Sequence, residues 1–134
     1  MVGYSGTPLF KKLGLKEGYA VKFVNPPAHY QKLIGDILNQ VLVSNGKKDF
    51  DFIHLFTNQV KDLEKQLPSL MKQIKKDGMI WVSWYKASSK KSTELNENIV
   101  RDTALAAGLV DVKVCAVDED WSGLKLVYRL KDRS

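Results

Sequence analysis

The segment from Lys86 to Thr93 carries the densest set of side chains that could bind a ligand. It reads Lys-Ala-Ser-Ser-Lys-Lys-Ser-Thr and lies just before a stretch of helical periodicity that ends at Ala107. We expect Thr93 to cap that helix. Ammonium groups, hydroxyls and the free N–H groups of a helix N-terminus all favour phosphate or carboxylate. P-loop spacing is absent, so a solvated lysine loop is the competing interpretation. The candidate anion ligands here are Lys86, Ser88, Ser89, Lys90 and Thr93.

Two histidines could transfer protons, because an imidazole titrates near neutral pH. His29 lies near the start of the first expected helix, but no carboxylate or nucleophile is adjacent to it in sequence. A surface or capping role is therefore the simpler interpretation. His54 alternates with Phe52 and Phe56 at strand spacing, which favours a hydrogen-bonded core or interface histidine. Two histidines this far apart make a weak case for a metal site.

The remaining reactive side chains lie near the C-terminus. Cys115 is the only cysteine and lies in an apolar strand, so we expect a buried, inert thiol and no intrachain disulfide. Asp118, Glu119 and Asp120 lack calcium-loop spacing and favour a polar turn. Trp121 follows in the same turn, and we expect it to be exposed and to mark a contact surface.

The net charge of +6 and the pI near 9.4 suggest nucleic acid as a partner. However, the lysines of residues 61–76 alternate with acidic residues, which is typical of a solvated helix face. The chain has only three arginines, the residue that base-reading surfaces favour. Specific DNA recognition is therefore unlikely from the sequence, and nonspecific binding through lysines is a weaker alternative.

The size and composition predict one soluble domain. The chain has 134 residues, of which 44% are hydrophobic. No apolar run approaches the roughly 20 residues that span a bilayer, and residues 1–7 lack a signal-peptide pattern. With a single cysteine, these features fit a reducing cytoplasm.

Apolar strands alternate with amphipathic helices along most of the chain. We expect an irregular N-terminal arm at residues 1–18, with one helical turn at 9–13, and a single domain at 19–134. The expected strands are 19–24, 50–56, 79–85, 112–117 and 124–130. The expected helices are 27–42, 59–76 and 93–107. Pro68 should kink the second helix or start a second segment, and Asp77-Gly78 should stop it. This order predicts an α/β fold, a three-layer Rossmann-like sandwich with a mainly parallel sheet of about five strands, an antiparallel C-terminal strand and the order 1-2-3-5-4.

A ligand in such a fold binds outside the carboxyl ends of the strands. Three loops should meet there, at residues 25–29, 57–59 and 86–93. Asn25, His29 and Asn58 therefore join the candidate ligand-binding residues. The first loop begins Asn25-Pro26-Pro27, where two prolines remove two N–H donors.

The segments 50–56 and 77–84, together with the closing pair of strands at 112–130, resemble the carboxyl-side half of class I S-adenosylmethionine-dependent methyltransferases. The chain also resembles, over nearly its whole length, a family of short bacterial proteins known only as a domain of unknown function. The second resemblance is carried by Tyr4–Leu9, Ile53–Phe56, Ile80–Trp84 and Val112–Glu119. It implies a fold and a bacterial origin, and it implies no activity.

The first loop departs from the methyltransferase pattern, in which an acidic residue and a glycine-rich turn follow the first strand. The chain also lacks room for the strand-helix-strand block that would supply a ribose-binding acid. The sequence therefore favours a non-catalytic protein that binds a partner or a small anionic ligand at the strand-end crevice. The alternative is an enzyme, either a divergent methyltransferase or a phosphate-ligand enzyme that uses the 86–93 loop. No cofactor and no oligomeric state follow from the sequence.

Overall fold

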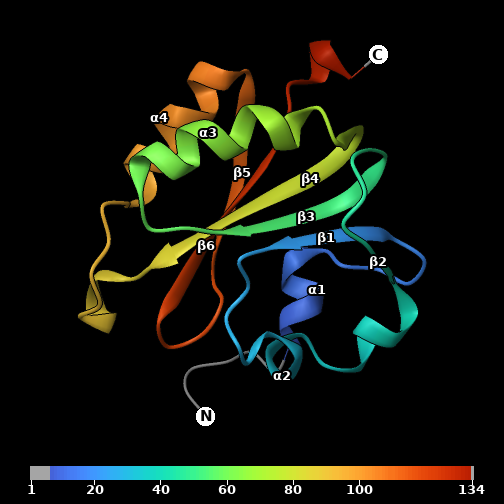
Figure 1. The fold of residues 1–134 in the computed structure, drawn as a ribbon, viewed down its shortest axis with the longest axis horizontal. Coiled ribbons are helices and arrows are strands. Elements are labelled where there is room, and N and C mark those ends of the chain that lie inside the picture. Colours follow the sequence, from blue (N-terminus) through green and yellow to red (C-terminus); the bar gives the residue numbers. More distant parts are fainter. Residues whose placement is uncertain (1–6, 134) are drawn as a thin grey trace.

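The computed structural model describes residues 7–133 and contains a mixed sheet of six strands (Figure 1). The strand order is β2-β1-β3-β4-β6-β5. The first four strands in that order run parallel, and β6 is antiparallel to both β4 and β5. The strands are β1 (Ala20–Val24), β2 (Leu42–Val43), β3 (Phe50–Phe56), β4 (Ile74–Tyr85), β5 (Leu109–Ala116) and β6 (Trp121–Tyr128). The predicted order of the five main strands is confirmed, and the two-residue edge strand β2 is added to it.

Helices cover both faces of this sheet, as the layer prediction required (Figure 1). On one face α3 (Val60–Met71) and α4 (Glu97–Ala107) pack over a core that includes Ile53, Leu55 and Val82. On the other face the short α1 (Leu9–Leu13) and α2 (Tyr30–Ile34) pack over a second core. Three 3-10 helices, Asp36–Gln40, Ala87–Ser89 and Leu130–Asp132, complete the described elements.

The helix expected over residues 27–42 is replaced by three shorter elements. α2 ends at Gly35, which adopts a φ of 85° and breaks the α-helical path. A 3-10 helix over Asp36–Gln40 follows, and Leu42–Val43 then pairs with β1 as strand β2. The apolar spacing does predict burial, because Ile34, Ile37 and Val41 are all buried. These residues are buried even though they lie in or between separate short elements and not in one helix.

The second expected helix stops earlier than residue 76, and Pro68 does not divide it. α3 is continuous with Pro68 inside, its ring on the exposed side while Leu67 and Leu70 are buried. The chain then enters β4 at Ile74, because Ile74 pairs with Phe50. Gly78 does not stop a helix, because it lies within β4. There is no room for a side chain at this position, since an added Cβ would lie 2.8 Å from Ile74 Cγ1. The register shift there accommodates the extra residues of β4.

The expected N-terminal arm lies partly outside the described residues, which begin at Thr7. From Leu9 onward it contributes to the core, with Leu13 and Leu15 buried. The indole Nε1–H of buried Trp81 donates to the carbonyl of Leu13 at 2.8 Å, which ties α1 to the sheet. Within residues 7–133, no helix is long and apolar enough to cross a membrane.

Candidate functional site

The sequence predicts a binding site at the carboxyl ends of the parallel strands, among them β1 and β3. β1 has β2 on one side and β3 on the other, and the loops that leave β1 and β3 lead to α2 and α3 on opposite faces of the sheet. Such a point, where the strand order reverses, is where open α/β sheets bind ligands. The antiparallel pairing of β4 with β6 brings the β5–β6 turn to the same edge, since Tyr85 pairs with Trp121.

An interaction between His29 and Asp118 bridges this edge. His29 Nε2 lies 2.7 Å from Asp118 Oδ2 and links the β1–α2 loop to the β5–β6 turn. We call this pair the latch. The other carboxylate oxygen of Asp118 accepts the N–H groups of Asp120 and Trp121, both at 2.8 Å. Burial of Asp118 favours its neutral form, but the hydrogen bonds from His29, Trp121 and Asp120 outweigh it and hold the pKa of Asp118 below its ordinary value. His29 therefore has the neighbouring carboxylate that its own sequence segment lacks.

The prediction that Trp121 is exposed is wrong. Its exposed fraction is 7%, and its ring packs edge-on against Phe56, with centroids 4.9 Å apart, and against Tyr85 at 4.3 Å. The cause is the register of β6, which begins at Trp121 and places it opposite the end of β4. The indole thus covers the ends of β3 and β4.

Asn58 forms hydrogen bonds that join the loop after β3 to the end of β4 and to the segment before α4. Its Oδ1 accepts the N–H of Tyr85 at 2.8 Å, and its carbonyl accepts the N–H of Glu94 at 2.9 Å. Asn25, which precedes the two prolines, is exposed and adopts a φ of 55°. The remaining candidates lie in the 86–93 segment.

Thr93 does not cap a helix. α4 begins at Glu97, and Asn96 is its N-cap, with Oδ1 accepting the N–H of Ile99 at 2.9 Å. Thr93 instead accepts the N–H of Leu95. The prediction is wrong because Asn96 lies three residues further along, and asparagine is preferred over threonine as an N-cap.

The 86–93 segment is largely occupied by its own contacts. Ser89 donates to the carbonyl of Lys86 at 2.7 Å and accepts the N–H of Lys91. Lys91 pairs with Asp120 at 2.9 Å, and the backbone N–H of Lys86 donates to the carbonyl of Asp120. Ser88 and Lys90 are exposed, and Lys90 has a φ of 62°. The structure therefore brings Lys86 and Lys91 to the β5–β6 turn, while Ser88 and Lys90 face solvent.

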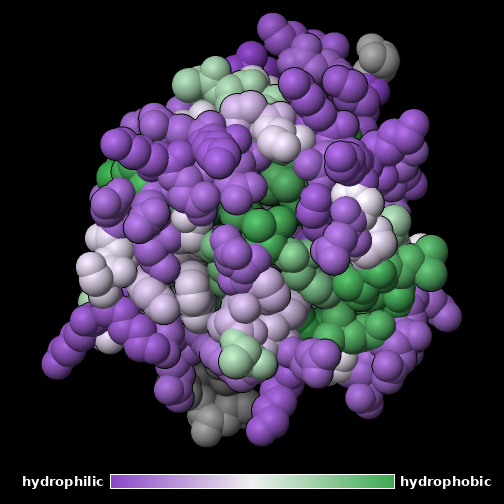
Figure 2. Space-filling model, in the orientation of Figure 1, coloured by the Kyte–Doolittle hydropathy of each residue, from purple (hydrophilic) through white to green (hydrophobic). Residues whose placement is uncertain are grey.

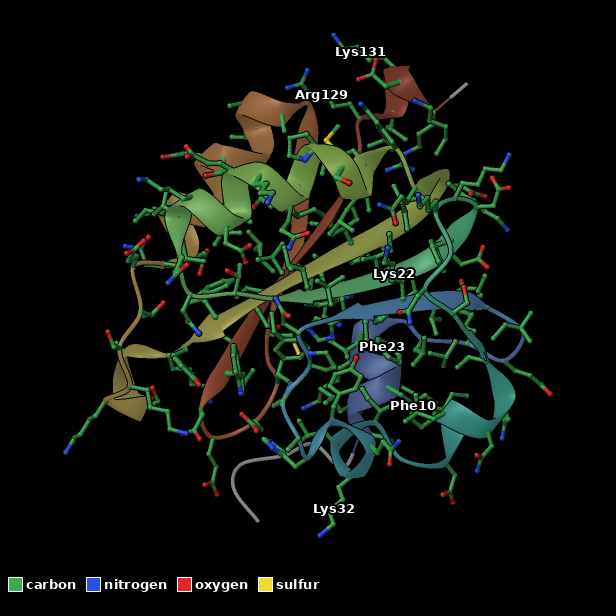
Figure 3. All side chains as sticks on the ribbon, viewed as in Figure 1. Phe10, Lys22, Phe23, Lys32, Arg129 and Lys131 are labelled. Atoms are coloured by element: carbon green, nitrogen blue, oxygen red, sulfur yellow. The ribbon has the colours of Figure 1, made fainter. Side chains whose placement is uncertain are left out.

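A hollow of about 660 Å³ lies beside the proline loop, at the carboxyl ends of β1 and β2. Phe23 projects into it from β1, on the side of α1 and α2 (Figure 3). The exposed side chains of Leu42 and Val43 continue the apolar surface over β2 (Figure 2). The lining residues are Phe23, Pro26, Pro27, Ala28, Tyr30, Gln31, Leu38, Asn39 and Val43.

A buried polar chain that the sequence did not reveal lies behind the hollow. Tyr30 Oη and His54 Nδ1 are 2.8 Å apart, and His54 Nε2 and Ser83 Oγ are also 2.8 Å apart. His54 is stacked on Phe56 with centroids 4.2 Å apart. Burial lowers the pKa of His54 to about 3, so the imidazole is neutral, and burial also raises the pKa of Tyr30. The prediction of a hydrogen-bonded core histidine is confirmed.

Asp51 has a structural role, and Cys115 is less buried than the sequence predicts. Asp51, which leads β3, accepts the N–H of Ala20 at 2.9 Å and pairs with Lys75, both at the amino end of the strand and away from the crevice. Cys115 is only half-buried, and burial raises the pKa of its thiol above the ordinary value. Among residues 7–133, no cluster of three histidine, cysteine or acidic side chains could hold a metal ion.

The fold is shared with known methyltransferases. A putative type 11 methyltransferase from Sulfolobus solfataricus matches with a TM-score of 0.63 at 15% identity, over 92% of this chain and 91% of that one. A SAM-dependent methyltransferase from Aquifex aeolicus matches with a TM-score of 0.59 at 19% identity, over 88% and 86% of the two chains. Fibrillarin from Aeropyrum pernix, solved with bound S-adenosyl-L-methionine, matches with a TM-score of 0.56 at 15% identity, over 93% and 70%. At these identities the likeness concerns the fold alone.

The sequence comparisons point to a family. No curated protein matches the sequence. The model of a family described as "Protein of unknown function (DUF3052)" matches residues 12–130, which is most of the chain. The protein belongs to the DUF3052 family.

Proposed function

We propose that this protein is a non-catalytic binding protein that holds a small, uncharged, planar group in the hollow beside Pro26 and Pro27. The observation that carries the proposal is the lining of that hollow. It has aromatic and aliphatic walls and two side-chain amides, Gln31 and Asn39, and none of its lining residues is an aspartate, glutamate, histidine, cysteine, lysine or arginine. The hydroxyl of Tyr30 is directed inward to His54.

Catalysis by acid, base or nucleophile needs such a side chain within reach of the substrate. Binding needs only complementary walls and a few polar groups that fix orientation. Amide side chains both donate and accept hydrogen bonds, so they suit the edge of a heterocycle. The absence of a cation in the lining argues for an uncharged group in place of the anion that the sequence suggested.

The latch supports the non-catalytic part of the proposal. Methyl transfer from S-adenosylmethionine would require the cofactor to approach the loop after β1. Pro26 and Pro27 offer no N–H groups in that loop, and the latch joins its far end to the β5–β6 turn. The methyltransferase fold would thus serve as a scaffold for the neighbouring hollow.

A thermal-shift comparison of adenosine, inorganic phosphate and S-adenosylmethionine tests this proposal. Adenosine, whose adenine base is an uncharged planar heterocycle, should raise the melting temperature, because a ligand stabilises the state that it binds, and inorganic phosphate should not. S-adenosylmethionine carries the same base and should raise the melting temperature no further than adenosine does. The variants Gln31→Ala and Asn39→Ala should reduce the shift, whereas Gln59→Ala removes an exposed amide near α3 and should leave it unchanged. Stabilisation by phosphate or S-adenosylmethionine, with none by adenosine, would overturn the proposal.

A further inference from the structure

The β5–β6 hairpin places two lysines directly opposite each other. Lys113 and Lys125 are cross-strand partners, and Lys125 also pairs with Trp81 of β4, whose indole lies in the core beneath α1. Both ammonium groups therefore project from the face of the sheet that carries α1. Like charges directly opposite each other on a sheet are destabilising.

Two further cations lie near this pair. The pKa of Lys125 is lowered first by partial burial and then by the charges of Lys113, Arg133 and Lys16. We call Lys16, Lys113, Lys125 and Arg133 the cation array. None of the ion pairs within residues 7–133 involves a member of the array. Residues 1–6 contain no aspartate or glutamate that could neutralise it.

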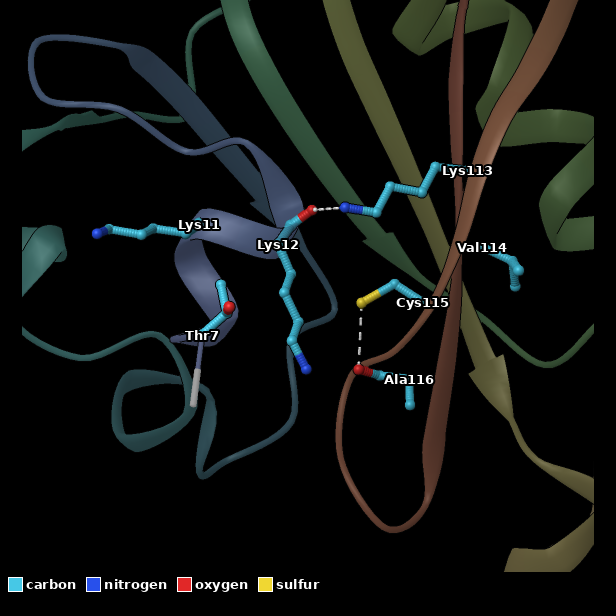
Figure 4. A pocket seen from close by; sticks show the side chains of 7 residues that line it. All are labelled: Thr7, Lys11, Lys12, Lys113, Val114, Cys115 and Ala116. Atoms are coloured by element: carbon cyan, nitrogen blue, oxygen red, sulfur yellow. Dashed lines mark hydrogen bonds between the residues drawn. The ribbon is translucent and has the colours of Figure 1, made fainter. Parts of the chain in front are cut away.

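One member of the array, Lys113, also lines a second hollow of about 410 Å³ (Figure 4). Lys113 reaches across to α1, where its Nζ donates to the carbonyl of Lys12 at 3.0 Å. This bond fixes the ammonium group at the rim, and Lys11 lines the same hollow. The basic surface therefore continues from the Lys113–Lys125 pair to α1, and the lining of the hollow contains no acidic residue.

We propose that the cation array binds the phosphodiester backbone of nucleic acid without reading base sequence. Several neighbouring cations that form no ion pair within residues 7–133 match a polymer of phosphates better than a single anion. Three of the four members are lysines, which bind phosphate as point charges and lack the bidentate fork that reads guanine. The surface lies on the hairpin and is separate from the hollow beside the prolines.

Fluorescence anisotropy with a labelled oligothymidylate of about 20 nucleotides tests this proposal, at salt concentrations from about 50 to 200 mM. With four cations on four phosphates, the slope of log Kobs against log salt should be about −3. The double variant Lys113→Gln/Lys125→Gln should roughly halve that slope and weaken binding at low salt on the order of tenfold or more. The matched control, Lys61→Gln/Lys65→Gln, removes the same charge from exposed positions of α3 and should bind like the wild type.

Three results would overturn the proposal. The first is no binding by the wild type at the lowest salt concentration, and the second is equal affinity of the two double variants. The third is competition by poly-L-glutamate as strong as that by unlabelled oligothymidylate, which would identify an acidic protein as the partner. Circular dichroism spectra of both variants establish that they are folded.

Discussion

His29 Nε2 and Asp118 Oδ2 lie 2.7 Å apart, although 89 residues separate them in the chain. The pair joins the loop after the first parallel strand to the turn of the C-terminal hairpin. It thereby links two segments at the carboxyl ends of the parallel strands. This link supports the proposal of a non-catalytic protein, which rests first on the lining of the hollow beside Pro26 and Pro27.

The two oxygens of Asp118 can be tested separately. Asp118→Asn keeps an oxygen that can accept the N–H groups of Asp120 and Trp121, so it should lower the unfolding free energy by less than about 1 kcal/mol. Asp118→Ala removes that acceptor as well and should cost about 1–2 kcal/mol more. Urea unfolding at pH 7 measures both changes. Equal losses for the two variants would show that the turn does not depend on the side-chain oxygen.

His54 should make the protein less stable in mild acid. Its folded pKa of about 3 lies below the unfolded value of roughly 6.5, so the unfolded chain takes up a proton that the folded protein does not. The contribution of the neutral His54 to the unfolding free energy is therefore fully present above pH 6.5, the unfolded pKa. It is lost progressively as the pH falls from there toward the folded pKa of about 3. Between pH 8 and pH 5 this residue alone should cost about 2 kcal/mol.

Urea unfolding of His54→Gln at both pH values measures this effect. The variant should have a lower unfolding free energy than the wild type at pH 8. It should lack the decrease of about 2 kcal/mol between pH 8 and pH 5 that His54 causes. His29→Gln, which changes the only other histidine, should retain it. If His54→Gln has the same pH slope as the wild type, the buried imidazole does not cause the acid sensitivity.

Gly123 permits the close approach of β6 to the core behind the crevice. An added Cβ would lie 3.1 Å from Trp81 Cε3 and 3.2 Å from both Ser83 Oγ and Val117 Cγ2. Gly123→Ala should therefore destabilise the protein by about 1–3 kcal/mol in urea unfolding. Ser122→Ala, at the neighbouring half-buried position, should change stability by no more than about 0.5 kcal/mol. An equally mild effect of Gly123→Ala would mean that this packing is looser than the distances indicate.

Repulsion across the hairpin should be measurable as a salt effect. Lys125→Gln removes one of the two opposed charges and should raise the unfolding free energy by about 0.2–1 kcal/mol at low ionic strength. Near 1 M salt, where screening is strong, the gain should vanish. Chemical unfolding of the wild type and the variant at both salt concentrations gives the comparison. A gain that persists at high salt would point to packing of the side chain as its cause.

Local patterns were enough to predict most of the framework. The apolar runs of β1, β3 and β4 and the turn signals between them predicted where these strands lie along the chain. Gly35 explains why the predicted first helix is longer than α2. Apolar periodicity identifies the buried residues, but it does not show that one glycine adopts a positive φ and ends the helix. The cap prediction for Thr93 was wrong because Asn96 is the residue that caps α4, and Pro68 starts no second segment because it lies inside a continuous α3.

The contacts of the site depend on register between distant strands. Nothing near His29 in the sequence indicates Asp118, and nothing near Trp121 indicates Phe56. The pairing of Tyr85 with Trp121 brings these groups together. The Tyr30–His54–Ser83 chain is equally non-local, although an apolar flank on both sides of His54 did indicate a buried imidazole. The proline loop was visible in the sequence, while the hollow beside it required the placement of β2.

The most direct test of the account is a ¹⁵N–¹H correlation spectrum recorded during separate titrations with adenosine and with S-adenosylmethionine. Adenosine should shift the amide signals of Phe23, Gln31 and Asn39 and leave those of Thr57 and Asp118 in place. S-adenosylmethionine should not shift Thr57 or Asp118, because Pro26 and Pro27 offer it no N–H groups and the latch joins their loop to the β5–β6 turn. Saturable shifts of Thr57, Asn58 and Asp118 with S-adenosylmethionine would contradict the account, since they would place the methyltransferase cofactor in the crevice.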